Sequence, residues 1–129
     1  MKKTILIVDD ALLYRELLKS IIEQLGFATE SCDDGSTAIA YLAEHNEKIS
    51  AVILDVNMPE IDGISALGHF SSKYPNLPVI MITGSEDASD ARSAVGLGAL
   101  GFIQKPLQTN SIGKTIRALL ESRGITASA

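Results

Sequence analysis

Residues 5–10 of this chain read ILIVDD, and this stretch decides the fold. Four consecutive apolar residues end at two aspartates, without the polar alternation of a strand that has one face in water. Such a run predicts a strand covered on both faces, as in a parallel sheet between layers of helices. Asp9 and Asp10 therefore stand at the carboxyl end of a buried strand, the edge at which open parallel sheets bind ligands.

Three further apolar runs are each followed by a polar side chain. They are residues 51–54 before Asp55, residues 79–82 before Thr83, and residues 100–103, which precede Lys105 by one intervening residue. A more mixed segment, residues 27–32, reads as a strand at one edge of the sheet, and residues 100–103 read as the other edge. The carboxyl ends of parallel strands share one edge, so these polar groups are expected to meet.

Helical patterns separate the strands, at residues 13–25, 36–44, 64–73, 86–97 and 110–122. The apolar face of the first helix comprises Leu13, Leu17, Leu18, Ile21 and Leu25. Gly26 is expected to end that helix and Ser36 to cap the second. The fourth helix is rich in Ala, Ser and Gly, which predicts the weakest anchorage of the five. We expect residues 124–129 to form a frayed C-terminal tail.

Five strand–helix units predict an α/β fold, a flavodoxin-like doubly wound sheet of five parallel strands with five helices. With the mixed strand at one edge, the expected strand order is 2-1-3-4-5. In that order the first and third strands are neighbours at the switch point. Asp9, Asp10 and Asp55 are expected there, within a single domain that spans residues 1–123.

Composition excludes several functional classes. The net charge of −5 and the lack of a basic cluster argue against direct nucleic-acid binding. The apolar runs are far too short for a membrane span, and the N-terminus lacks the features of a signal peptide. The single cysteine, Cys32, fits a reducing cytoplasm and reads as a small buried residue. His45 and His69 are expected at the surface, without metal-ligand partners.

Three neighbouring carboxylates repel one another, and a hard divalent cation with oxygen ligands relieves that repulsion. The expected ion is Mg²⁺, with Asp10 and Asp55 as direct ligands, Asp9 acting through water, and the backbone carbonyl of Asn57 completing the shell. Asp55, at the end of a central strand, is the candidate nucleophile, because a carboxylate can form an acyl phosphate. Lys105 and Thr83 are the candidates for contacting phosphoryl oxygens.

The chain resembles, from Thr4 to about Arg123, the receiver domain of two-component response regulators, in particular single-domain receivers of the chemotaxis type. The resemblance rests on residues 7–10 (IVDD), 54–59 (LDVNMP), 62–64 (DGI), 82–84 (ITG) and 98–106 (GALGFIQKP). It implies Mg²⁺-dependent phosphoryl transfer to Asp55 from a histidine kinase or a phosphotransfer protein. The chain would then catalyse only its own phosphorylation and dephosphorylation.

The resemblance also implies a switch. Thr83 would move toward the phosphoryl group, and Phe102, where many relatives have Tyr, would change rotamer or simply fill the core. The expected output surface is the fourth helix, the fifth strand and the fifth helix. Gly84 predicts an open pocket, Asn57 and Ser85 occupy positions that tune dephosphorylation, and a cis Lys105–Pro106 bond is implied.

Two other classes of protein share parts of this pattern. A haloacid-dehalogenase-like phosphatase also uses a strand-end Asp and Mg²⁺, but it needs a second Asp where this chain has Asn57. A flavodoxin-like FMN carrier needs a Ser/Thr/Gly-rich phosphate loop after the first strand, where this chain has Asp9 and Asp10. For the output we expect a stand-alone receiver that binds a protein effector, with fusion to an output domain as the alternative.

Overall fold

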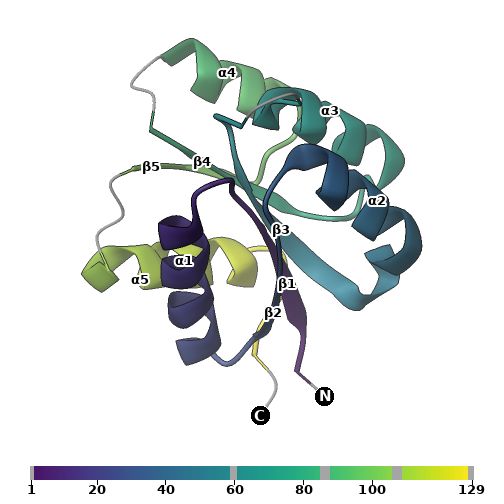
Figure 1. Ribbon diagram of the computed structural model, residues 1–129. Helices are drawn as coiled ribbons and strands as arrows, with labels where there is room; N and C mark the ends of the chain where they lie inside the picture. The colour runs from purple at the N-terminus through teal and green to yellow at the C-terminus, as the bar shows by residue number, and fades with distance from the viewer. Residues whose placement is uncertain (1, 59–60, 85–87, 106–108, 128–129) are drawn as a thin grey trace.

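The computed structural model describes residues 2–58, 61–84, 88–105 and 109–127, and it confirms the predicted fold. Its five parallel strands lie in the order β2-β1-β3-β4-β5 (Figure 1). The strands are β1 (Thr4–Val8), β2 (Ala28–Cys32), β3 (Ile49–Asp55), β4 (Val79–Thr83) and β5 (Gly101–Gln104). The helices are α1 (Leu12–Gln24), α2 (Gly35–His45), the short 3₁₀ helix η1 (Asn46–Lys48), α3 (Gly63–Lys73), α4 (Ala88–Gly96) and α5 (Thr109–Glu121).

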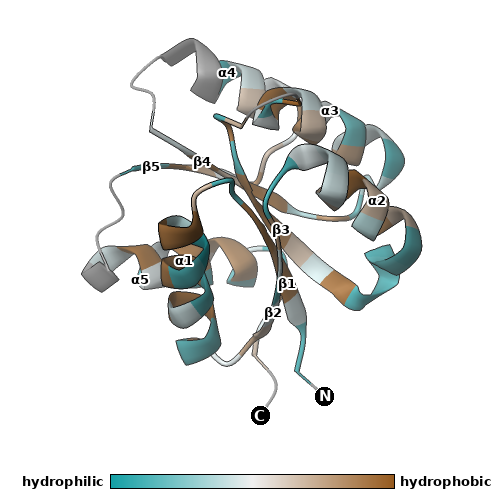
Figure 2. Ribbon diagram, in the orientation of Figure 1, coloured by the Kyte–Doolittle hydropathy of each residue, from teal (hydrophilic) through white to brown (hydrophobic). Residues whose placement is uncertain are grey.

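The central strands are apolar on both faces because each face is covered by helices (Figure 2). Alternate residues point to opposite sides, so that Ile5 and Ile7 of β1 pack in one core while Leu6 and Val8 pack in the other. Helices α1 and α5 supply the first core, and α2, α3 and α4 supply the second. The strand ends are thereby held rigidly at one edge of the sheet.

Local sequence signals set the helix ends, and one of them differs from expectation. Gly26 has a positive φ of 100°, which confirms it as the residue that ends α1. The prediction that Ser36 caps α2 was wrong, because the Asp34 carboxylate accepts the Thr37 backbone N–H at 2.7 Å. This bond lowers the pKa of Asp34. Asp34, two residues before Ser36, is therefore the N-cap that accepts a backbone N–H from the first turn of α2.

Two other expectations about packing need correction. Leu13 does not join the apolar face of α1, since it is 74% exposed. Helix α1 turns its buried face to the sheet only from its second turn onward, through Leu18, Ile21 and Ile22. The tail is not frayed at Ile125, whose N–H bonds to the Leu120 carbonyl at 2.9 Å and whose side chain packs on the α1–α5 core.

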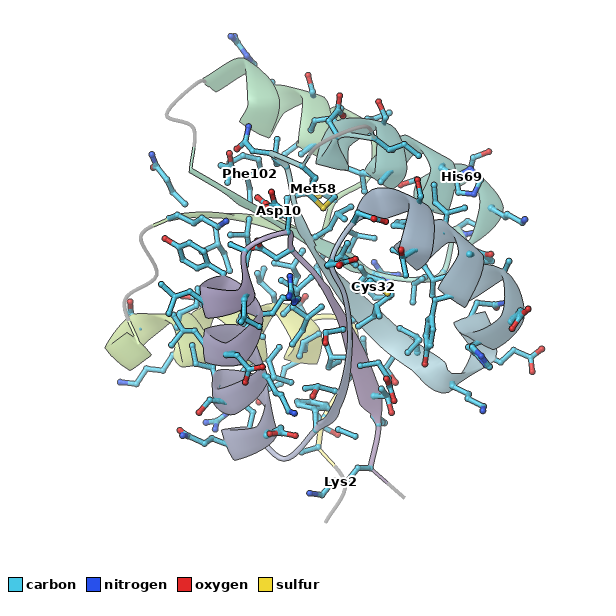
Figure 3. The ribbon with its side chains drawn as sticks, in the orientation of Figure 1. Lys2, Asp10, Cys32, Met58, His69 and Phe102 are labelled. Atoms are coloured by element: carbon cyan, nitrogen blue, oxygen red, sulfur yellow. The ribbon has the colours of Figure 1, made fainter. Side chains whose placement is uncertain are left out.

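The expected surface positions of the two histidines and the expected burial of Cys32 are confirmed. His69 is exposed on α3 (Figure 3). His45 is half-buried, with its ring beside that of Tyr41. Cys32 is buried at the end of β2, and burial, with nearby acidic charges, raises the pKa of its thiol to about 11, so it is an unreactive packing residue. Among the described residues, no helix combines the length and apolarity that a membrane crossing needs.

Candidate functional site

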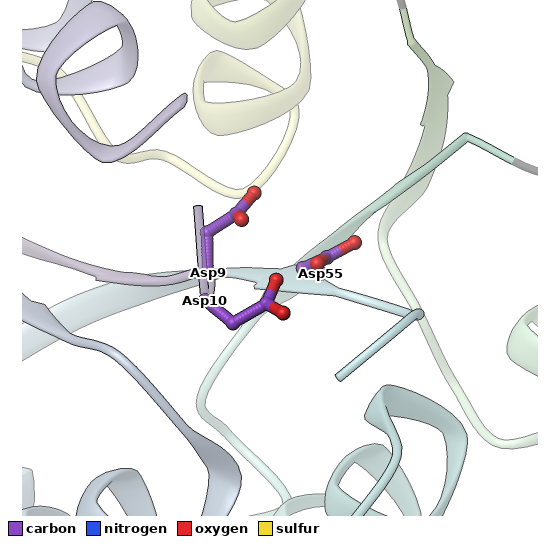
Figure 4. A group of neighbouring side chains, drawn as sticks. All are labelled: Asp9, Asp10 and Asp55. Atoms are coloured by element: carbon purple, nitrogen blue, oxygen red, sulfur yellow. The ribbon is translucent and has the colours of Figure 1, made fainter. Parts of the chain in front are cut away.

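Three carboxylates meet where β1 and β3 end (Figure 4). Asp9 and Asp10 follow the last residue of β1, and Asp55 is the last residue of β3. One oxygen from each carboxylate lies within 4.8 Å of the others. Asp9 and Asp55 are buried, whereas Asp10 is exposed at the mouth of the cluster. The structure thus brings together the three acids that the strand-end pattern predicted.

The backbone around Asp55 is closely packed. The N–H of Val56 donates to the Ile82 carbonyl at 2.8 Å, and the N–H of Gly63 donates to the Val56 carbonyl at 2.8 Å. The start of α3 lies directly on this strand end, because a Cβ at Gly63 would overlap the carbonyl of Asp55 and lie 2.6 Å from the Val56 Cα. Asp62 caps α3 by accepting the Ser65 N–H, so α3 holds the Asp55 backbone in place.

Lys105 bridges the acids from the end of β5. Its Nζ lies 3.1 Å from Asp9 Oδ2 and 3.5 Å from Asp55 Oδ1, and its side chain is only 13% exposed. The Lys105 N–H donates to the Thr83 carbonyl at 2.6 Å, which ties the ends of β4 and β5 together. The ammonium is therefore placed to neutralise charge on the two buried carboxylates.

One ammonium does not compensate three carboxylates. Burial, and then the charge of Asp9, raise the pKa of the Asp55 carboxyl to about 6, although Lys105 and the Asn57 N–H oppose the shift. The Asp9 Oδ2 atom is buried and, among the described residues, accepts no hydrogen bond of good geometry beyond its ion pair with Lys105. An all-oxygen cluster with surplus negative charge fits a hard divalent cation.

Of the two residues expected to respond to phosphorylation, Thr83 is linked to the acids through Asn57, whereas Phe102 packs in the core. The buried Thr83 hydroxyl donates to Asn57 Oδ1 at 3.1 Å, and the Asn57 N–H donates to Asp55 Oδ1 at 3.2 Å. Phe102 is half-buried, pairs in register with Met81, and packs against the core shared by α2, α3 and α4. Figure 3 shows Phe102 and Asp10 toward the end of the molecule where the strands finish. Pro106 and Ser85 lie outside the described residues.

Sequence reasoning missed two residues of α1 that also reach the site. The Arg15 Nη1 donates to the Asp9 carbonyl at 2.8 Å. The Lys105 Nζ lies over the face of the Tyr14 ring, 4.0 Å from the ring centroid. Neither residue follows an apolar strand, so the strand-end pattern could not single them out. Within the part of the chain that the structure describes, a Cβ built on Gly84 meets no heavy atom within 4 Å.

Comparison with known proteins gives a consistent family assignment. The family model of the response regulator receiver domain matches residues 5–117. The probable transcriptional regulatory protein TcrX of Mycobacterium tuberculosis is 30% identical over 123 residues, which are 95% of this chain and 52% of TcrX. The chain spans about half the length of the first curated relatives it matches.

Solved structures agree in fold over nearly the whole chain. A CheY-like receiver domain protein from Methanospirillum hungatei matches with a TM-score of 0.87 and 25% identity, covering 96% of this chain and 98% of that one. The CheX–CheY–BeF₃–Mg²⁺ complex from Borrelia burgdorferi matches with a TM-score of 0.86 and 30% identity, covering 91% of this chain and 88% of that one.

Proposed function

This chain belongs to the response regulator receiver domain family, and from this premise we propose that it is a phosphoacceptor switch of a two-component phosphorelay. Asp55 takes a phosphoryl group from the phosphohistidine of a histidine kinase or of a phosphotransfer protein. An Asp55 oxygen attacks phosphorus, the bond from phosphorus to the imidazole nitrogen breaks, and its electron pair stays on that nitrogen. The product is an acyl phosphate at the end of β3.

The observation that carries this proposal is the meeting of Asp9, Asp10 and Asp55 around the Lys105 ammonium. The acids fit Mg²⁺, with Asp10 and Asp55 as direct ligands, the Asn57 carbonyl as a further ligand and Asp9 acting through water. The ion, when bound, would offset negative charge on the phosphoryl oxygens and on Asp55. The related Borrelia CheY complex includes Mg²⁺ and BeF₃, which supports this choice.

Two side chains of the protein would bind the oxygens of the phosphoryl group. Lys105 already lies 3.5 Å from Asp55 Oδ1, so its ammonium can bind a phosphoryl oxygen with a small displacement. The Thr83 hydroxyl, which now donates to Asn57, would turn to donate to another phosphoryl oxygen. The Lys105 ammonium and the Thr83 hydroxyl would complete the phosphoryl site together with Asp55.

Movement of Thr83 would carry the signal outward. Phe102 would repack on β5 as Thr83 leaves Asn57, and Asn57 lines a pocket that also includes Ser93 of α4. The proposed output surface is α4, β5 and α5, where Val95 is 68% exposed. Phosphorylation would shift the balance between two conformations of this surface.

We place this switch in the cytoplasm, with a histidine kinase or phosphotransfer protein upstream. Downstream we expect a protein effector or a fused output domain, and residues 1–123 as the receiver with a short tail at 124–129. The chain would catalyse only its own phosphorylation and dephosphorylation. The haloacid-dehalogenase alternative gains no support, because the amide of Asn57, bonded to Thr83, stands where that family needs an acid.

The test is intact-mass spectrometry after incubation with a small phosphodonor, with and without Mg²⁺. We expect one phosphate on the native chain, dependent on Mg²⁺, and none on Asp55→Asn. Lys105→Ala should bind Mg²⁺ but take up phosphate more slowly. Equal uptake by native chain and Asp55→Asn would refute the assignment of Asp55.

A further inference from the structure

The Lys105 ammonium has a third neighbour besides the two buried acids. Tyr14, in the first turn of α1, places its ring centroid 4.0 Å from Lys105 Nζ. That distance is well inside the range of about 6 Å over which an aromatic face attracts a cation. Since the Lys105 side chain is only 13% exposed, water screens this attraction weakly.

The position of Tyr14 is tied to the same acid that pairs with Lys105. Asp9 Oδ1 accepts the Ala11 N–H at 2.9 Å, and the Asp9 carbonyl accepts the Arg15 guanidinium at 2.8 Å. The Arg15 N–H in turn donates to the Ala11 carbonyl at 3.0 Å, which closes the first turn. These bonds anchor the backbone of the turn that carries Tyr14 to Asp9, and from this turn the Tyr14 ring reaches the Lys105 ammonium.

From this geometry we infer that Tyr14 is a positioning residue, whose ring holds the Lys105 ammonium toward the phosphoryl site throughout the phosphorylation cycle. This inference rests on the proposed function. Phosphorylation converts the Asp55 carboxylate into an acyl phosphate, and a divalent cation competes with Lys105 for the charge of Asp9. Among the contacts of the Lys105 ammonium in the described residues, the Tyr14 ring is the partner that carries no charge for either event to change.

The phenol hydroxyl takes no part in this contact, because the ammonium lies over the ring face. Tyr14→Phe should therefore keep the interaction, while Tyr14→Leu keeps an apolar side chain but removes the aromatic face. A role in merely covering the site would be served by leucine as well as by an aromatic ring. The pair of variants thus separates positioning of Lys105 from simple exclusion of water.

The kinetic test is the rate of phosphate uptake from a small phosphodonor with saturating Mg²⁺, in native protein and both variants. We expect Tyr14→Leu to be slower by about five-fold, and Tyr14→Phe to lie within about two-fold of native. Leu13→Ala, which alters the exposed neighbour on α1, is the control and should match native. A Tyr14→Leu rate equal to native, or a Tyr14→Phe rate as low as that of Tyr14→Leu, would overturn the inference.

A second measurement does not depend on phosphorylation. Protons on the Lys105 side chain next to Nζ, assigned by comparison with Lys105→Arg, should show an upfield ring-current shift in native protein and in Tyr14→Phe. The shift should disappear in Tyr14→Leu, and its absence from native protein would overturn the contact. A native chain that takes no phosphate would instead refute the proposed function.

Discussion

Two regions of the sheet differ in how firmly they are packed. We call the central strands β1, β3 and β4 the packed half, and the edge strand β5 with helix α4 the loose half. All but one residue of β3 and all of β4 are buried, whereas β5 has three half-buried residues and an exposed Gln104. Helix α4, beside β5, buries Ala94 but leaves Val95 exposed, and Leu97, which follows the helix, is exposed as well. Asp9 and Asp55 belong to the firmly packed half, while Lys105 and Phe102 belong to the loosely packed one.

The difference in packing suits the separate roles that we propose for the two halves. The carboxylates must be held close together against their repulsion, which needs strands that cannot shift. A responding surface needs the opposite, few buried contacts and a low cost of rearrangement. Thr83 stands at the boundary, because it ends β4 and pairs in register with Gln104 of β5. In the proposed switch, a change at Asp55 would therefore be transmitted to β5 through the Thr83 hydroxyl.

The largest effect on stability is expected from a substitution in the packed half, at Gly63. In Gly63→Ala the new methyl group would overlap the backbone of Asp55 and Val56, which cannot move aside as a flexible side chain can. We expect a loss of about 3 kcal/mol in the free energy of unfolding, measured by urea denaturation.

The matched control is Gly84→Ala, where a Cβ meets no heavy atom within 4 Å. Its stability should stay within about 0.5 kcal/mol of native. Phosphate uptake from small donors should slow, because the methyl group narrows the open pocket. Similar stability of the two variants would contradict the close packing of α3 on the end of β3.

The second prediction concerns how the ionisation of Asp55 changes the stability of the metal-free protein with pH. Burial and Asp9 raise its pKa from 3.8 to about 6, so between these values the unfolded chain ionises Asp55 while the folded chain keeps its proton. Stability contributed by this group is therefore present below about pH 4 and is lost as pH rises through about 6. Without metal, Asp55→Asn should be more stable than native by about 2–3 kcal/mol near pH 7.5.

Thermal or urea unfolding in EDTA at two pH values tests this sign. The advantage of Asp55→Asn should shrink to near zero at about pH 3, because Asp55 of the native sequence is then protonated in both the folded and the unfolded state. An equal advantage at both pH values would show that the charge of Asp55 is not its cause.

The third prediction separates the exposed acid from the buried ones. Asp10→Ala should weaken Mg²⁺ binding about ten-fold or more, since it removes a direct ligand, and should leave the metal-free protein as stable as native or slightly more so. Calorimetric titration with Mg²⁺ measures the affinity. Asp33→Ala, which removes an exposed carboxylate just after β2, is the control for general charge. Unchanged affinity in Asp10→Ala would exclude it as a ligand.

The smallest effect is expected in the loose half. Val95→Ala on α4 should change the free energy of unfolding by less than about 0.5 kcal/mol, because the side chain is 68% exposed. Its rate of phosphate uptake should equal that of native protein. A loss of more than about 1 kcal/mol in urea denaturation would show that Val95 is packed, and the contrast between the halves would fail.

The same contrast explains which features the sequence could predict. Asp9, Asp10 and Asp55 were predictable because an uninterrupted apolar run shows both that a strand is buried and where it ends. Parallel topology then brings those ends to one edge, so no knowledge of individual contacts was needed. The strand order followed from the mixed composition of residues 27–32.

Features that depend on a particular side chain's neighbours were not predictable in this way. The period of α1 predicted burial of Leu13, but this residue of the first turn is exposed, and the buried residues of the helix begin only at Leu18. Periodicity also gave no sign that Ile125 would fold back on α5, since a lone apolar residue in a tail has no pattern. The contact of Tyr14 with Lys105 joins the first turn of α1 to the residue after β5, and no local pattern in the sequence links these two positions.

The most direct test of this account is to identify the phosphorylated residue. After incubation with a phosphodonor and Mg²⁺, borohydride reduction converts an aspartyl phosphate to homoserine, which peptide mass mapping can locate. The account predicts homoserine at position 55 alone, and none when Mg²⁺ is replaced by EDTA. Modification at Asp9 or Asp10 instead, or stable phosphate on His45 or His69, would contradict it.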